Sequence, residues 1–120
     1  MAESLTNIVY TKKGKARVTF KISKDTVHEL SIASAVLVGD FEGCDWKVSN
    51  GSALQFLKDG SLSVTRTISD LSKSYQYKYF VKCIDDQGKS FDKWIIDDNT
   101  KIKTFKDNSG NVNSLLQFNS

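Results

Sequence analysis

The stretch "SYQYKYFVKCI" (residues 74–84) alternates regularly between two kinds of side chain. Successive side chains of a β-strand point to opposite faces, so this alternation predicts a long strand. One face carries Tyr75, Tyr77, Tyr79, Val81 and Cys83, which we expect in the core. The other face is amphipathic and suits a partly open surface. It carries Gln76, Lys78, Phe80, Lys82 and Ile84.

Alternation with a period of two continues through most of the chain. "RVTFKIS" (17–23) and "SLSVTRTI" (61–68) predict two further strands, and Asp59-Gly60 predicts a hairpin because both residues tolerate positive φ. A strand carrying Trp94 is expected in "FDKWIIDD" (91–98), and a closing strand in "SLLQF" (114–118). No window shows clear helical periodicity. The pattern predicts an all-β, immunoglobulin-like β-sandwich of about seven to eight strands, with a small closed barrel as the alternative.

Length and composition fit one small domain. We expect residues 1–14 to be an N-terminal leader that can be partly ordered, and residues 15–120 to form the domain of the 120-residue chain. The net charge of +3 is too mild to indicate nucleic acid or a membrane surface as partner. Neither a secretory signal nor a membrane span is recognisable, so we expect a soluble, cytoplasmic protein.

Few side chains suit catalysis or cofactor binding. The single histidine, His28, has no nucleophile that spacing would pair with it. The acid pairs Asp85-Asp86 and Asp97-Asp98 should point to opposite faces, which does not favour a shared metal ion. There is no CxxC motif and no glycine-rich phosphate loop. We therefore predict no enzyme activity, no catalytic residue, no metal and no cofactor.

The two tryptophans leave two interpretations open. Trp46 and Trp94 each follow an apolar strand and stand among charged residues, which would put flat rings at the rim of the sandwich. Alternatively, one or both complete the core, as tryptophan does in many sandwiches.

Six segments, in order, resemble the family 48 carbohydrate-binding module, over about residues 15–118. This early set domain precedes the catalytic barrel of isoamylases and branching enzymes, and it forms the glycogen-binding domain of the AMP-activated protein kinase beta subunit. "VLVGDFEGCDW" (36–46) resembles a family strand followed by "GDFNxW", "YQYKYFV" (75–81) resembles "YxYKFxVDG", and "KWIIDDN" (93–99) resembles "xWxxDPxN". The other segments are "VTFKI" (18–22), "FLKDGSLSVTRTI" (56–68) and "DNSGNVNSLLQF" (107–118).

The resemblance implies non-catalytic binding of α-glucan, such as glycogen or starch. Lys78 and Trp94 match the family's sugar-binding lysine and second tryptophan, while Asn111 and Asn113 match the polar residues of its last loop. The first tryptophan of the family falls at Cys44, and Trp46, two residues later, is its expected substitute. The implied ligand is an α-1,4-glucan or maltooligosaccharide, and the implied protein partner is a glycogen-metabolising enzyme.

Two other functions remain open. An interaction or scaffolding module that has lost the sugar site would explain Cys44, and it predicts a buried Trp46. Binding of single-stranded nucleic acid through aromatic and lysine side chains is less favoured, because the basic residues are dispersed.

Overall fold

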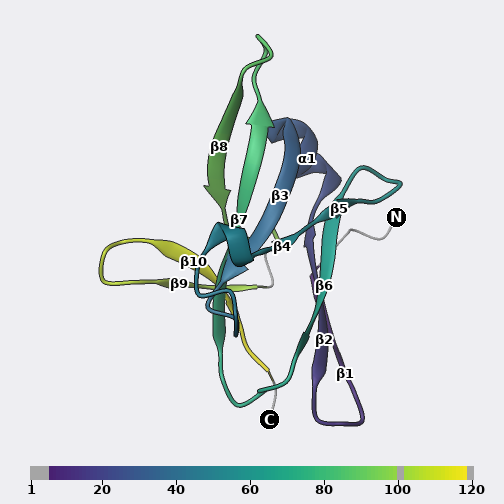
Figure 1. Cartoon of the computed structure of the whole chain (residues 1–120), viewed down its shortest axis with the longest axis vertical. Coiled ribbons are helices and arrows are strands. Elements are labelled where there is room, and N and C mark those ends of the chain that lie inside the picture. The colour runs from purple at the N-terminus through teal and green to yellow at the C-terminus, as the bar shows by residue number, and fades with distance from the viewer. Residues whose placement is uncertain (1–5, 100–101, 119–120) are drawn as a thin grey trace.

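The computed structural model describes residues 6–99 and 102–118 and has two antiparallel β-sheets packed as a sandwich (Figure 1). The first sheet has the order β1-β2-β6-β5. Its strands are β1 (Asn7–Tyr10), β2 (Ala16–Ile22), β5 (Gln55–Phe56) and β6 (Leu62–Ile68). The predicted all-β, immunoglobulin-like sandwich is confirmed.

The second sheet has six strands in the order β4-β3-β7-β10-β9, and β8 pairs separately with β7. Its strands are β3 (Ile32–Gly39), β4 (Ser52–Ala53), β7 (Tyr75–Ile84), β8 (Ser90–Ile95), β9 (Lys103–Lys106) and β10 (Val112–Leu116). The closing strand thus begins two residues before the predicted start at Ser114.

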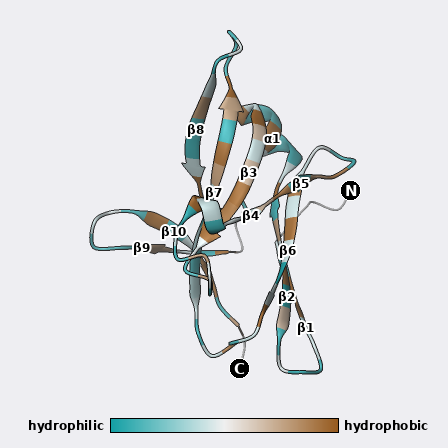
Figure 2. Ribbon diagram, in the orientation of Figure 1, coloured by the Kyte–Doolittle hydropathy of each residue, from teal (hydrophilic) through white to brown (hydrophobic). Residues whose placement is uncertain are grey.

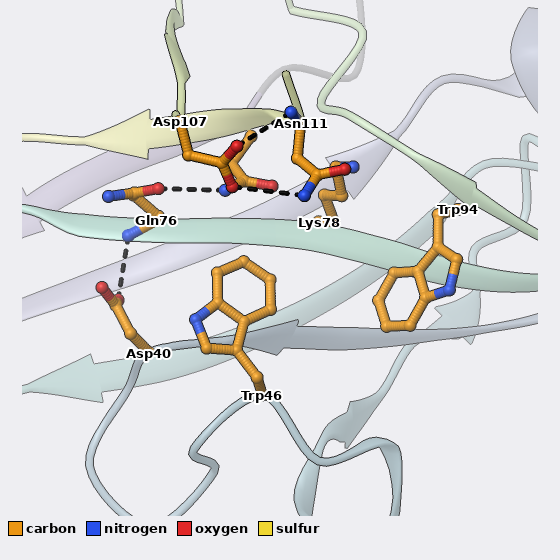
Figure 3. Close-up of a pocket in the computed structure, with 8 residues that line it drawn as sticks. Asp40, Trp46, Gln76, Lys78, Trp94, Asp107 and Asn111 are labelled. Atoms are coloured by element: carbon orange, nitrogen blue, oxygen red, sulfur yellow. Dashed lines mark hydrogen bonds between the residues drawn. The ribbon is translucent and has the colours of Figure 1, made fainter. Parts of the chain in front are cut away.

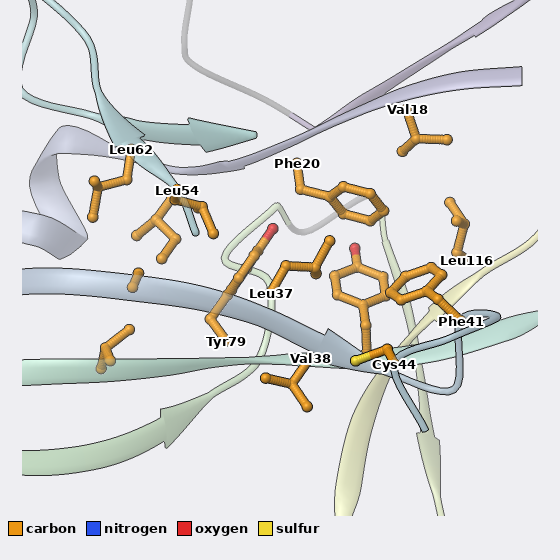
Figure 4. Close-up of a cluster of buried hydrophobic side chains, with 14 of the residues drawn as sticks. Val18, Phe20, Leu37, Val38, Phe41, Cys44, Leu54, Leu62, Tyr79 and Leu116 are labelled. Carbon is orange, nitrogen blue, oxygen red and sulfur yellow. The ribbon is translucent and has the colours of Figure 1, made fainter. Parts of the chain in front are cut away.

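The core lies between the inner faces of the two sheets. The predicted alternation of β7 is confirmed, because its three tyrosines, Val81 and Cys83 are all buried. From the first sheet, Val18, Phe20 and Ile22 pack against them, as the alternation of "RVTFKIS" predicted. Figure 4 shows Phe20, Phe41 and Tyr79 in this cluster, and in Figure 2 hydrophobic residues recur along β3 and β7.

One edge of strand β7 pairs with β3, and along the other edge the neighbouring strand changes part-way. Its first residues, Tyr75 to Tyr77, pair with β10, whereas the stretch from Tyr79 to Ile84 pairs with β8. Lys78 lies between these two pairings. The two neighbouring strands therefore end beside the middle of β7, and the side chains at their ends meet there.

Four hairpin turns share one design. In each, the first residue of a five-residue turn donates its N–H to the carbonyl of the fifth, and a glycine at the fourth position has positive φ. This is a type I turn followed by a glycine bulge. The hairpin predicted at Asp59-Gly60 is confirmed, and of the two residues only Gly60 has positive φ. The turns span residues 11–15, 57–61, 85–89 and 107–111.

One short helix was not predicted. Helix α1 (Lys24–Leu30) follows β2, and a short 3-10 turn, η1 (Val48–Asn50), precedes β4. Ser23 caps α1 by accepting a hydrogen bond from the backbone N–H of Thr26, and Asp25 lies in its first turn. Seven residues are too few for helical periodicity to stand out.

The segment before β2 contributes to the first sheet. Strand β1 lies within residues 1–14, the expected leader, and pairs with β2, and Thr6 in the same segment is buried. Residues 1–5 of that segment lie outside the described part. Within the described ranges, no helix is long and apolar enough to cross a membrane.

Candidate functional site

All five predicted sugar-binding residues line one groove on the outer face of the second sheet (Figure 3). The groove is open to solvent and has a volume of about 450 Å³. Three acidic or amide side chains complete it. Its lining is Asp40, Trp46, Gln76, Lys78, Trp94, Asp107, Asn111 and Asn113.

Strand β7 forms the floor, and β8 adds the second tryptophan. Gln76 and Lys78 point outward because their neighbours Tyr75, Tyr77 and Tyr79 point into the core. Trp94 pairs with Phe80, and the two ring centroids lie 4.9 Å apart in an edge-to-face arrangement. This contact holds an indole that is still 43% exposed.

Trp46 reaches the groove through an unusual backbone. The loop after β3 buries Cys44 and then has positive φ at both Asp45 (52°) and Trp46 (61°). The N–H of Trp46 donates to the carbonyl of Gly39 at 2.9 Å, which ties the loop to the end of β3. The indole is left 38% exposed. Both tryptophans thus lie at the rim, not in the core.

Two hydrogen-bonded clusters form the polar part of the groove. In the first, the Nδ2 of Asn113 donates to Oε1 of Gln76 at 2.9 Å. The backbone N–H of Gln76 donates to Oδ1 of Asp40, also at 2.9 Å, while the N–H of Asp40 donates to the carbonyl of Gln76. The side chains of this cluster are therefore held in fixed positions before any ligand arrives.

The second cluster belongs to the turn between β9 and β10. Oδ1 of Asp107 accepts from the backbone N–H groups of Ser109 and Asn111, both at 2.9 Å, and its Oδ2 accepts from Nδ2 of Asn111. These bonds, led by the one from the Asn111 backbone and aided by the charge of Lys78, lower the pKa of Asp107. In Figure 3, Asp107 and Asn111 lie together near Lys78, and the indole rings of Trp46 and Trp94 are seen below them in the view.

Sequence reasoning missed Asp40, Gln76 and Asp107. Gln76 had a signal, since it lies two residues before Lys78 on the same predicted face. Asp107 begins a turn, and its role in the groove depends on how β9 and β10 pair, which local sequence does not reveal. Asp40 depends likewise on the pairing of β3 with β7.

A buried carboxylate lies behind the site. Oδ2 of Asp97 accepts hydrogen bonds from the hydroxyls of Thr6 (2.6 Å), Tyr77 (2.7 Å) and Tyr79 (3.1 Å). Burial raises the pKa of Asp97, and these bonds limit the rise. Its neighbour Asp98 is exposed, so the predicted divergence of this acid pair is confirmed.

Neither a metal nor a known relative identifies the site. Within residues 6–99 and 102–118, no group of His, Cys, Asp or Glu side chains could hold a metal ion. Comparison with protein-family models, curated proteins and solved structures finds no match for this chain. What the groove binds must therefore be inferred from its side chains.

Proposed function

We propose that the protein is a non-catalytic α-glucan-binding module, with glycogen, starch or maltooligosaccharides as ligands. The observation that carries this proposal is the meeting of five residues, taken from four separate segments of the chain, around one open groove. They are Trp46, Lys78, Trp94, Asn111 and Asn113.

The side chains of the groove match the chemistry of a sugar ring. A glucose ring has an apolar C–H face and a rim of hydroxyls, and a flat, partly immobilised indole can cover that face with little loss of entropy. The ammonium group of Lys78 and the amides of Asn111 and Asn113 can bond to the hydroxyls. Each such bond contributes about 0.5–1.5 kcal/mol, so a shallow groove should bind with a Kd between about micromolar and millimolar.

The charge of the groove disfavours nucleic acid. One lysine, Lys78, shares it with the carboxylates of Asp40 and Asp107. Strong binding to a phosphate backbone requires several cations that neutralise phosphates. A neutral polysaccharide meets no such conflict.

The scaffolding alternative predicts a buried Trp46. That side chain is 38% exposed and lines the same groove as Trp94, which favours glucan binding over this alternative. The cytoplasm is the compartment we propose, because Cys44 and Cys83 are free thiols, as is usual in a reducing environment. A glycogen-metabolising enzyme remains the protein partner we would test first.

Retardation in native gels containing glycogen or soluble starch tests the proposal. Wild type should be slowed, whereas Trp94→Ala should migrate nearly as in a gel without polysaccharide. Phe91→Ala is the matched control, because Phe91 is 46% exposed on the same strand but pairs with Cys83, on the opposite face from Trp94. It should behave as wild type. Equal mobility of all three proteins with and without polysaccharide would refute glucan binding.

A further inference from the structure

A second groove adjoins the first and shares two of its residues. Trp94 and Lys78 line both grooves, and the second has a volume of about 760 Å³. Its lining also includes residues 96–99 after β8, Ile102, and Thr104 on β9. The two grooves therefore meet at Trp94 and Lys78.

The second groove has the same mixed character as the first. Ile96, which is 37% exposed, and Ile102 supply apolar surface next to the indole of Trp94. The hydroxyl of Thr104 and the carboxylate of Asp98 supply polar groups. Apolar surface with a few polar groups at its margin matches a sugar ring as it does in the first groove.

Asp98 is firmly positioned in this wall. Its Oδ2 accepts from the backbone N–H of Ser23 at 3.1 Å and from the hydroxyls of Ser23 and Thr26, each at 2.6 Å. These bonds tie the connection after β8 to the start of α1. The second groove is thus bounded by a carboxylate whose position is fixed, which limits the entropy lost when a ligand binds.

We propose that the second groove extends the glucan site, so that the protein prefers glucans long enough to cross Trp94 over short oligosaccharides. This inference rests on the proposed function. Trp94 and Lys78 then serve both halves of the ligand. Ile96, Ile102, Thr104 and Asp98 contact only long chains.

Binding of maltotriose and maltoheptaose, measured by titration calorimetry, tests the inference. Wild type should bind maltoheptaose at least about tenfold more tightly, one decade being about 1.4 kcal/mol. A longer sugar chain can also bind one groove in more positions, which raises its apparent affinity without a second groove. The variants therefore distinguish these two explanations. Ile96→Ala should weaken maltoheptaose binding about fivefold and leave maltotriose unchanged. Ile84→Ala, a similarly exposed isoleucine outside both grooves, should change neither.

A second variant covers the case in which Ile96→Ala fails to fold. Thr104→Arg fills part of the second groove from an exposed position on β9, and it should remove most of the advantage of maltoheptaose. Equal wild-type affinity for both sugars, or an equal loss for both in the folded variants, would overturn the extension while leaving the proposed function intact. Failure of wild type to bind either sugar would overturn both.

Discussion

The backbone of Trp46 leads to a prediction about stability at the proposed binding site. A residue with a Cβ atom in the left-handed region costs about 1–2 kcal/mol, and Trp46 has φ of 61°. Glycine avoids that cost. However, a glycine gives the unfolded chain more freedom, which lowers the free energy of unfolding by about 0.4–1 kcal/mol relative to alanine. Both Trp46→Gly and Trp46→Ala remove the ring, so their comparison isolates the backbone. Trp46→Gly should be the more stable by about 1 kcal/mol.

Lys47 provides a matched control in the next position. It is exposed and has an ordinary φ of −95°, so there glycine should be less stable than alanine. The order of the Gly and Ala variants should therefore reverse between positions 46 and 47. Urea unfolding followed by circular dichroism measures the stability difference between the Gly and Ala variants at each position. In thermal unfolding, 1 kcal/mol corresponds to about 4 °C in Tm for a chain of this size.

The same variants separate strain from binding. Trp46→Gly and Trp46→Ala should weaken glycogen binding equally, because both lack the indole, whereas the Lys47 variants should bind as wild type. If glycine is the less stable residue at position 46 by the same margin as at position 47, then the left-handed backbone does not carry the strain assigned to it.

Three further predictions concern the acids and a glycine around the groove. Burial raises the folded-state pKa of Asp97 above the roughly 3.9 of an unfolded chain, so its contribution to stability should fall as pH rises from about 4 through the folded pKa. The urea midpoint of wild type minus that of Asp97→Asn should fall as the pH rises over this range. A difference that does not change with pH would contradict the raised pKa of Asp97. Asp107→Ala should weaken glycogen binding about tenfold, because it releases the side-chain amide of Asn111. Asp85→Ala, in a turn of the same design elsewhere, should leave binding unchanged. Equal affinities of the two variants in native gels would contradict a role of Asp107 in positioning Asn111. Gly39→Ala should destabilise by about 1–3 kcal/mol in urea unfolding, because the added Cβ would collide with the backbone carbonyl of Gln76, and a variant as stable as wild type would show that the two strands can separate there.

The strands could be predicted from the sequence because their signal is local. Alternation with a period of two marks the buried face of β7, and the three tyrosines Tyr75, Tyr77 and Tyr79 lie where it placed them. Lys78 on the opposite face follows from the same periodicity. One glycine turn was readable as well, because the Asp59-Gly60 pair between two apolar stretches is a strong hairpin signal.

The parts that could not be predicted depend on contacts between distant segments. Helix α1 has only seven residues, which is too short for helical periodicity to stand out in the sequence. The burial of Asp97 depends on hydroxyls that lie 91, 20 and 18 residues away in the chain. The position of the Trp46 indole depends on the positive φ angles of Asp45 and Trp46 in the loop after β3. Glycine would have signalled such angles in the sequence, but neither residue is a glycine.

The exchange of partners along β7 explains why the groove forms where it does. A continuous neighbouring strand would cover the outer face beside Lys78 with one regular row of side chains. Because β8 ends and β10 begins at this point, Asn113 and Trp94 approach Lys78 from two directions, and residues 96–99 after β8 line the second groove next to them. The buried Cys44 fits the same geometry, because it lets the loop turn inward before Trp46 emerges two residues later. A tryptophan at position 44 would have to displace core side chains, so in this loop an indole reaches the groove from position 46 and not from position 44.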